Sequence, residues 1–308
     1  MKSGIRGLGP RPSRDTFRAP AKINLTLEVL GRREDGYHGI RSVMVPLELA
    51  DTITIEPCEE LVFDCEVREL AGEENLALRA LRAIEAATRR PLGARVTLHK
   101  AIPTQAGLGG GSSDAAAILR AAMEGTLGVV PALDWLEIAR GLGSDVPFFL
   151  VAGAALVEGT GERVTALGAV PAWPVLVVKP PAQVVTAQAY AALDERKRPG
   201  RPRSESLSLQ CAQALQHGDF DGVQNALGND FHELALDVPS IRHAYDALRA
   251  AGAAKPLIAG SGSCLFVLAR DAAERDALHE RLRLSPEFEV FATAFARDDA
   301  WREASARA

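Results

Sequence analysis

The segment that decides the fold runs Ile102-Pro-Thr-Gln-Ala-Gly-Leu-Gly-Gly-Gly-Ser-Ser113. Alternating apolar residues at 94–100 predict a strand before it, and helical spacing at 112–123 predicts a helix after it. Glycines let backbone N–H groups approach a ligand without a Cβ clash, and the first turn of a helix carries N–H groups that can bind an anion. We therefore interpret the segment as a phosphate-binding loop at a helix start.

Three other interpretations fit the segment less well. A Walker A loop requires G-x-x-x-x-G-K-[ST], and no lysine follows the glycines here. A dinucleotide fingerprint is approached by Gly107, Gly109 and Ser112, but the flanking βαβ unit is missing. A turn that binds no ligand seldom needs four glycines followed by two serines, since each glycine costs about 0.5–1 kcal/mol of chain entropy.

Composition narrows the class of protein. The chain has 308 residues, 47% of them hydrophobic and 24% charged, which is typical of a globular protein long enough for two domains. Its net charge of −5 argues against nucleic-acid binding, and no apolar run has the length of a membrane span. The four cysteines lack zinc-ligand spacing, so we expect reduced thiols in a cytoplasmic protein. Composition leaves a monomer or a homodimer open.

Strands and helices are mixed along the chain, which predicts an α+β fold rather than a doubly wound sheet. The strand at 21–30 alternates so that Lys22 and Asn24 share its polar face. Further strands are expected at 42–49, 52–56 and 61–67 and helices at 75–89 and 134–143, while residues 145–157 are expected to begin as a loop and become a strand.

The second half is expected to repeat this mixture. We predict strands at 175–179 and 288–295, a strand with a glycine turn at 257–268, and helices at 186–193, 207–217, 221–234, 239–251 and 272–282. The domains are expected to be a flexible basic tail (1–16), an N-terminal domain with the phosphate loop (17–170) and a C-terminal domain (171–308).

Three separated segments carry a family resemblance. Ala19-Pro-Ala-Lys-Ile-Asn-Leu25, the glycine loop and Ile258-Ala-Gly-Ser-Gly-Ser-Cys264 together resemble the GHMP kinases (galacto-, homoserine, mevalonate and phosphomevalonate kinases). The resemblance implies ATP-dependent phosphorylation of a small molecule. It also implies a two-domain fold, with an N-terminal domain like ribosomal protein S5 domain 2 and a C-terminal ferredoxin-like α/β sandwich.

Two further segments narrow the resemblance to one branch of that family. Asp35-Gly-Tyr-His38 and Gly143-Ser-Asp-Val-Pro-Phe148 are similar to the branch that phosphorylates the 2-hydroxyl of a cytidine diphosphate derivative of methylerythritol, in non-mevalonate isoprenoid synthesis. A homoserine- or mevalonate-type kinase remains an alternative, as does a non-catalytic nucleotide-binding protein on the same fold.

The resemblance also implies roles for single residues. Asp145 is expected to be the catalytic base and Lys22 its partner, because an ammonium keeps a carboxylate ionised and stabilises charge on the transferred group. The expected substrate-binding residues are Asn24, Tyr37, His38, Thr186 and Tyr190, with Tyr37 and His38 holding the cytosine.

On the nucleotide side, the resemblance implies ATP with Mg²⁺. Ser112 or Ser113 is expected to contact the metal, and the loop at Gly260 to Ser263 is expected to pack beside the phosphate loop. The expected ATP-binding residues are Pro103, Thr104, Gln105, Ala106, Gly107, Leu108, Gly109, Gly110, Gly111, Ser112 and Ser113, together with Lys100 and Asn75.

Overall fold

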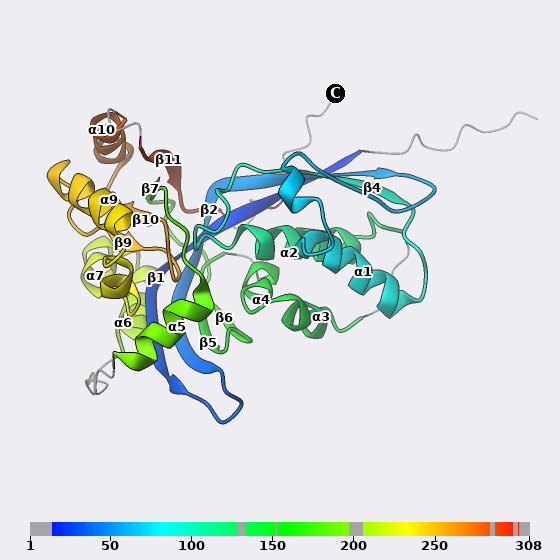
Figure 1. Ribbon diagram of the computed structural model, residues 1–308, viewed down its shortest axis with the longest axis horizontal. Coiled ribbons are helices and arrows are strands. Elements are labelled where there is room, and N and C mark those ends of the chain that lie inside the picture. Colours follow the sequence, from blue (N-terminus) through cyan, green and yellow to red (C-terminus); the bar gives the residue numbers. More distant parts are fainter. Residues whose placement is uncertain are drawn as a thin grey trace, which may run out of the picture.

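The computed structural model describes residues 14–128, 133–151, 153–196, 206–283, 287–297 and 301. Two sheets lie side by side, each with helices packed against it (Figure 1), which confirms the predicted α+β class. In this part of the chain, no helix combines the length and the apolar character that a membrane crossing needs.

A long antiparallel hairpin forms the centre of the first sheet. Its strands are β1 (Asp15–Arg32) and β2 (His38–Pro57). The strand order is β3-β4-β2-β1-β8, and β5 and β6 extend the sheet from β2. The other strands are β3 (Val62–Cys65), β4 (Ala94–His99), β5 (Ala155–Gly159), β6 (Arg163–Ala166) and β8 (Gly228–Asn229).

The prediction of two strands at 42–49 and 52–56 was wrong. The segment is one strand, whose pairing with β1 continues through Ala50 and Asp51. A buried aspartate would ordinarily interrupt such a strand. Here Lys100 and the backbone N–H groups of Ala101 and Ile102 satisfy the Asp51 carboxylate.

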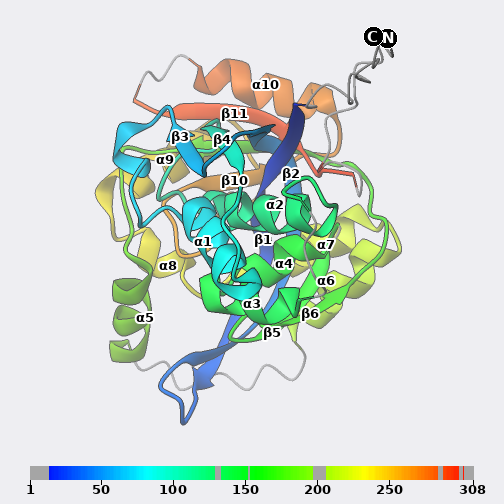
Figure 2. The same ribbon diagram turned by 90° about the vertical axis from the view of Figure 1, so that its right-hand side faces the viewer.

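Helices α1 (Leu76–Thr88), α2 (Gly110–Met123), α3 (Trp135–Leu142) and α4 (Val146–Leu150) gather on one face of the hairpin (Figure 2). Small side chains at 115–117 let α2 approach the sheet closely. Helix α2 begins two residues earlier than predicted, and residues 146–150 form a short helix rather than a loop. Pro147 favours that helix because its ring presets φ in the first turn.

The second sheet has the strand order β11-β7-β10-β9, and all its pairs are antiparallel. Its strands are β7 (Pro174–Lys179), β9 (Leu257–Ile258), β10 (Leu265–Leu268) and β11 (Glu289–Ala294). The helices of the second half of the chain are α5 (Thr186–Glu195), α6 (Leu207–Gln216), α7 (Phe220–Ala226), α8 (His232–Ala235), α9 (Pro239–Ala250) and α10 (Ala272–Leu282). Helices α8, α9 and α10 contact the second sheet, whereas α6 and α7 contact strands of the first. This order matches the predicted ferredoxin-like sandwich.

The two halves share a core. Ile23 and Val45 of the hairpin lie in one buried cluster with Val177 and Phe266 of the second sheet. The single helix predicted at 221–234 was wrong, because the chain leaves α7 to pair β8 in parallel with β1. The domain boundary between residues 170 and 171 stays a prediction. Strand β8, which follows that boundary in the sequence, belongs to the first sheet.

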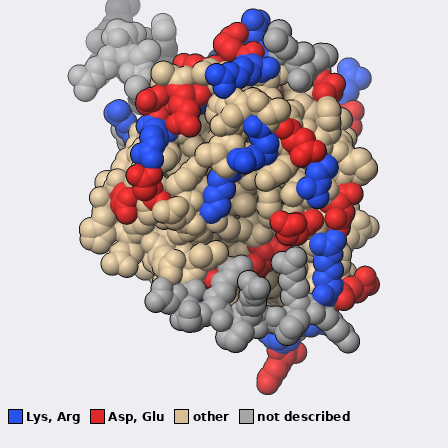
Figure 3. Space-filling model, turned by 90° about the vertical axis from the view of Figure 1, so that its left-hand side faces the viewer, with Lys and Arg blue, Asp and Glu red and all other residues tan. Residues whose placement is uncertain are grey.

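The ends of the chain also join the halves. Trp301 is buried against the Phe149 ring, and its carbonyl accepts a hydrogen bond from the Arg18 backbone N–H. The predicted tail at 1–16 lies mostly outside the described residues, but Asp15 and Thr16 already belong to β1. Charged side chains of both signs alternate over the face that carries the helices of the second sheet (Figure 3).

Packing of α1 against the first sheet yields a stability prediction. Leu81 on α1 is fully buried, whereas Leu136 on α3 is 45% exposed. Leu81→Ala is expected to lower the free energy of unfolding by about 2–5 kcal/mol through lost burial and a cavity. Leu136→Ala is the control and should change it by less than about 0.5 kcal/mol. Urea unfolding measures both, and equal losses would contradict this packing.

Candidate active site

Three segments that are distant in the sequence meet at the middle of β1. The Lys22 backbone N–H donates to the Leu108 carbonyl of the phosphate loop at 2.8 Å. The Cys264 N–H of the second glycine loop donates to the Ala106 carbonyl at 3.1 Å. The structure therefore confirms that the loop at Gly260 to Ser263 lies beside the phosphate loop.

The glycines allow these backbones to touch. Gly107 has a φ of +77°, and a Cβ there would lie 2.1 Å from the Ala259 carbonyl oxygen. Gly109 has a φ of +72°, and its Cβ would lie 3.0 Å from both Lys22 Cγ and the Phe149 ring. The sequence suggested that these glycines are needed to bind a ligand. Two of them, Gly107 and Gly109, are also needed because neighbouring protein segments pack against them.

The start of α2 offers polar groups without side-chain partners. Its N-cap is Gly109, which has no side chain to bind the first N–H groups of the helix. Ser113 Oγ is buried and makes no hydrogen bond, and Ser112 is half-buried beside Gly143. An anion at this end of the helix would satisfy the backbone N–H groups.

Lys22 and Asp145 form the charged pair of the site. Lys22 Nζ lies 3.5 Å from Asp145 Oδ2, and their side chains are 5% and 28% exposed. Asp145 occupies the N-cap position of α4, yet its carboxylate makes no capping hydrogen bond. The backbone of Asp145 thus takes the N-cap position, while its carboxylate faces the buried ammonium.

Asn24 holds this ammonium in place. Its Oδ1 accepts from Lys22 Nζ at 2.8 Å and from the Gly260 backbone N–H at 3.1 Å. Its Nδ2 donates to Ser42 Oγ at 2.8 Å. Lys22 and Asn24 share a face as predicted, and the Asn24 amide ties the lysine to the second glycine loop.

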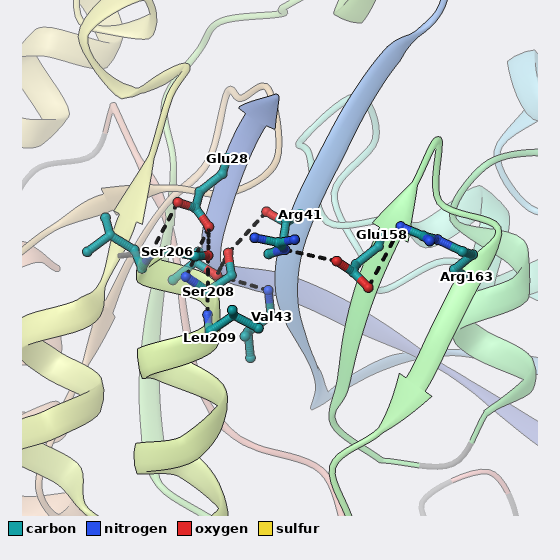
Figure 4. A network of polar contacts seen from close by, with 10 residues as sticks. Glu28, Arg41, Val43, Glu158, Arg163, Ser206, Ser208 and Leu209 are labelled. Carbon is teal, nitrogen blue, oxygen red and sulfur yellow. Dashed lines mark hydrogen bonds and ion pairs between the residues drawn. The ribbon is translucent and has the colours of Figure 1, made fainter. Parts of the chain in front are cut away.

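Buried polar contacts continue along the same face of the hairpin to the start of α6. Ser42 Oγ donates to the Thr26 carbonyl, and Thr26 Oγ1 donates to Ser208 Oγ at 2.9 Å. Figure 4 shows the Glu28 carboxylate bound by Ser206 and Ser208 at the first turn of α6. We call this row of Asn24, Ser42, Thr26, Ser208 and Glu28 the polar ladder.

The residues predicted to bind cytidine lie around α5. His38 stacks on Tyr190, with ring centroids 4.7 Å apart, and its Nε2 lies 2.8 Å from Asp194 Oδ1. Tyr190 packs edge-on against Phe231, and burial together with the nearby Asp145 charge raises the pKa of its phenol to about 12. No base fits between rings as close as those of His38 and Tyr190.

Tyr37 and Thr186 flank this stack. Tyr37 is 68% exposed near the tip of the hairpin, next to His38 in the chain. Thr186 Oγ1 lies 3.0 Å from Ser261 Oγ, which connects α5 to the second glycine loop. The structure therefore groups His38, Tyr190 and Thr186, and leaves the Tyr37 ring open to solvent.

Two predicted nucleotide-binding residues are occupied by other contacts. Asn75 caps α1, where its Oδ1 accepts from the Ala77 N–H and its Nδ2 donates to the Leu70 carbonyl. Lys100 is buried between the carboxylates of Asp51 and Asp114. Sequence reasoning missed both acids: Asp114 directly follows the glycine loop and was given no role, and no local pattern marks Asp51.

Comparison with known proteins agrees with this geometry. A model of the GHMP kinases N terminal domain matches residues 75–153, and a model of the GHMP kinases C terminal domain matches residues 211–285. The chain belongs to the GHMP kinase family.

Named relatives place the chain more closely. It is 41% identical over 266 residues to the 4-diphosphocytidyl-2-C-methyl-D-erythritol kinase of Deinococcus radiodurans, covering 84% of this chain and 85% of the relative. A crystal structure of 4-(cytidine 5'-diphospho)-2C-methyl-D-erythritol kinase matches with a TM-score of 0.72 and 35% identity over 91% of this chain and 99% of that one. Homoserine kinase from Cytophaga hutchinsonii shares the fold, with a TM-score of 0.70, 17% identity and coverage of 98% and 99%.

The contact between the two glycine loops predicts the effect of a single methyl group. Gly125 also has a positive φ, of +84°, but a Cβ there would meet nothing within 4 Å. Gly125→Ala should cost about 1–2 kcal/mol of stability, from backbone strain alone. Gly107→Ala adds the collision with Ala259, so it should cost more and also weaken ATP binding. Thermal unfolding and calorimetric titration with ATP compare the two variants, and equal effects would rule out the tight loop contact.

The polar ladder predicts a dependence of stability on pH. Burial alone would raise the pKa of the Glu28 carboxyl, but hydrogen bonds from Ser206, Ser208 and Leu207 outweigh it and hold that pKa below its ordinary value of 4.5. The ionised form therefore stabilises the fold above pH 4.5, and this contribution is lost as the pH falls through the lowered pKa.

Glu28→Gln removes that contribution. The stability difference between the wild type and Glu28→Gln should be largest near neutral pH and should narrow below pH 4.5. Thermal melting from pH 7 downward measures it, with the exposed Glu59→Gln as the control. A difference that stays constant with pH would show that the Glu28 charge does not stabilise α6.

Proposed function

We propose that this chain phosphorylates the 2-hydroxyl of 4-diphosphocytidyl-2-C-methyl-D-erythritol with ATP, giving the 2-phosphate and ADP. The observation that carries the proposal is the buried Lys22 ammonium beside Asp145, next to a glycine loop at a helix start. The similarity to kinases named for this substrate supports the choice of acceptor. The reaction belongs to isoprenoid precursor synthesis, and four free thiols support a cytoplasmic setting.

The proposed chemistry follows from the charges at the site. Asp145 accepts the proton of the attacking hydroxyl, and its partial exposure leaves one side of the carboxylate open to the acceptor. The Lys22 ammonium, 3.5 Å from Asp145 Oδ2, stabilises the negative charge on the phosphoryl group during transfer. Asn24 Oδ1 accepts from the Lys22 ammonium and is itself held by the Gly260 N–H, so the ammonium needs no rearrangement before the reaction.

The proposed nucleotide position is the phosphate loop from Pro103 to Ser113. Backbone N–H groups at the start of α2 bind the phosphates, aided by the positive end of the helix dipole. The second glycine loop packs against Gly107 and thereby fixes the conformation of the phosphate loop. Asn75 and Lys100 then support the site indirectly, without contacting the nucleotide. Asn75 caps α1, and Lys100 pairs with Asp114 beside the phosphate loop.

The proposed metal is Mg²⁺ that binds with ATP. Among the residues that the structure describes, no group of three His, Cys, Asp or Glu side chains could hold a metal ion. Mg²⁺ often binds through substrate phosphates, waters and few protein ligands, so the unpartnered Ser113 hydroxyl and the half-buried Ser112 fit this role. When bound, the metal would neutralise charge on the β- and γ-phosphates.

The proposed cytidine site is the aromatic group on α5 and the hairpin. His38 and Tyr190 present a preformed stack whose outer surface a base can cover, and the exposed Tyr37 ring can close over it. Base–aromatic stacking contributes about 1–3 kcal/mol per base. Thr186 and Asn24 would then lie toward the sugar and the acceptor alcohol.

An ADP-release assay tests the proposed acceptor. Purified protein with Mg-ATP should release ADP when 4-diphosphocytidyl-2-C-methyl-D-erythritol is added, and not when homoserine or mevalonate is added. ADP release with homoserine or mevalonate alone would overturn the proposed acceptor and favour another GHMP kinase. Absence of turnover with all three, despite ATP binding, would favour a non-catalytic nucleotide-binding protein.

The proposed base has its own test. Asp145→Asn should lower kcat by about 10²–10⁴-fold, because the amide cannot accept the hydroxyl proton, and it should still bind ATP. The control is Asp134→Asn, an exposed cap of α3 that asparagine can replace. Steady-state kinetics and calorimetry measure both, and Asp145→Asn with wild-type turnover would remove Asp145 as the base.

A further inference from the structure

A buried cluster of three charged residues lies under the phosphate loop. Lys100 follows β4 and its side chain is only 7% exposed. Its Nζ contacts Asp51 Oδ2 and lies 2.8 Å from Asp114 Oδ2. Both carboxyl groups are almost fully buried, so these contacts are the main compensation for removing three ionisable groups from water.

The cluster contacts both ends of the loop. At its start, Asp51 Oδ1 accepts from the backbone N–H groups of Ala101 at 2.6 Å and Ile102 at 2.8 Å. At its end, Asp114 belongs to α2, the helix whose first turn faces the proposed phosphates. A Cβ on Gly110 would lie 3.3 Å from Lys100 Nζ, so the ammonium sits directly beneath the helix start.

We propose that Asp51, Lys100 and Asp114 form a positioning clamp that holds the two ends of the phosphate loop together and thereby sets the affinity for the nucleotide. The proposal rests on the proposed function only in that it takes the loop to bind ATP. Lys100 acts through the loop and not as a phosphate ligand, since its ammonium is enclosed by two carboxylates.

The charge of the clamp matters because it lies behind an anion site. With all three groups ionised, one cation faces two anions, and the excess negative charge would oppose phosphate binding. Burial raises the pKa of Asp114 to about 8, which Lys100 opposes and the Asp51 charge supports. With Asp114 protonated the clamp is neutral, and with Asp114 ionised it carries one excess negative charge behind the loop.

Other ionisable groups lie nearby, in or directly after strands β3 and β4. Glu66 accepts from the Lys100 backbone N–H at 2.7 Å and pairs with His99 at the surface. The Cys65 thiol has its pKa raised, first of all by burial, and the charges of Lys100 and Asp114 act on it in opposite directions. Of the acids in this region, Asp114 is the one whose ionisation near pH 8 would add negative charge behind the loop.

The first test replaces the central cation. Lys100→Met should raise the ATP dissociation constant and the KM for ATP by about tenfold or more, because a displaced loop misplaces its N–H donors. The KM for the alcohol should stay unchanged. Amide hydrogen exchange should accelerate at 101–113 but not in the second sheet. Arg95→Met, which removes an exposed cation from β4, is the matched control.

If Lys100→Met binds ATP and exchanges amide hydrogens as Arg95→Met does, the cluster does not position the loop. Should Lys100→Met fail to fold, Lys100→Met with Asp114→Asn removes one buried acid together with the cation, and the same measurements apply. ATP binding and hydrogen exchange are measured without the acceptor alcohol, so these experiments test the clamp independently of the proposed substrate.

A second test uses the charge of Asp114. In the wild type, the ATP dissociation constant should rise between pH 7 and pH 9, by at most about tenfold per pH unit for one coupled proton. Asp114→Asn still offers Lys100 an oxygen but cannot ionise, so its dissociation constant should vary less over this range. A steeper or equal pH dependence in Asp114→Asn would contradict the assigned role of Asp114.

Discussion

The Lys22 ammonium lies almost entirely out of contact with solvent, and a buried charge persists only where its partners satisfy it. Asn24 supplies a hydrogen-bond acceptor from the same strand, and Asp145 supplies the opposite charge from the start of α4. Because these partners come from different segments, the ammonium can be satisfied only when the hairpin and α4 are in place. Formation of the charged site and formation of the fold are therefore coupled.

The same coupling joins the two glycine loops. The Asn24 carboxamide binds the Gly260 N–H as well as Lys22, so the second loop is fixed relative to the ammonium. Gly107 then allows the phosphate loop to lie against that second loop. On the other side, the clamp under the loop joins its two ends to β2 and α2. The two loops and the ammonium are therefore held in place by contacts that are mostly between backbone segments and buried polar side chains, and the proposed phosphate site needs such preorganisation.

The parts that the sequence predicted are those with local causes. Helix α3 begins after Asp134 because that side chain caps it, and Lys22 and Asn24 share a face because strands alternate. The parts that it missed depend on distant partners. Asp51 lies inside a continuous strand, where Lys100 and the backbone N–H groups of Ala101 and Ile102 bind its carboxyl group. After α7 the chain forms β8, which pairs with the distant strand β1. The family resemblance, rather than a local pattern, placed His38 and Tyr190 in one site, and the structure brings their rings into contact.

The proposed reaction requires one buried ammonium, that of Lys22, between the phosphate loop and the Asp145 carboxylate. A crystal structure with a non-hydrolysable ATP analogue and the cytidine substrate would locate both ligands. We expect the terminal phosphate between the start of α2 and Lys22 Nζ, with the 2-hydroxyl about 3 Å from an Asp145 oxygen. A nucleotide bound away from the 103–113 loop, or an acceptor hydroxyl that reaches neither Asp145 nor Lys22, would contradict it.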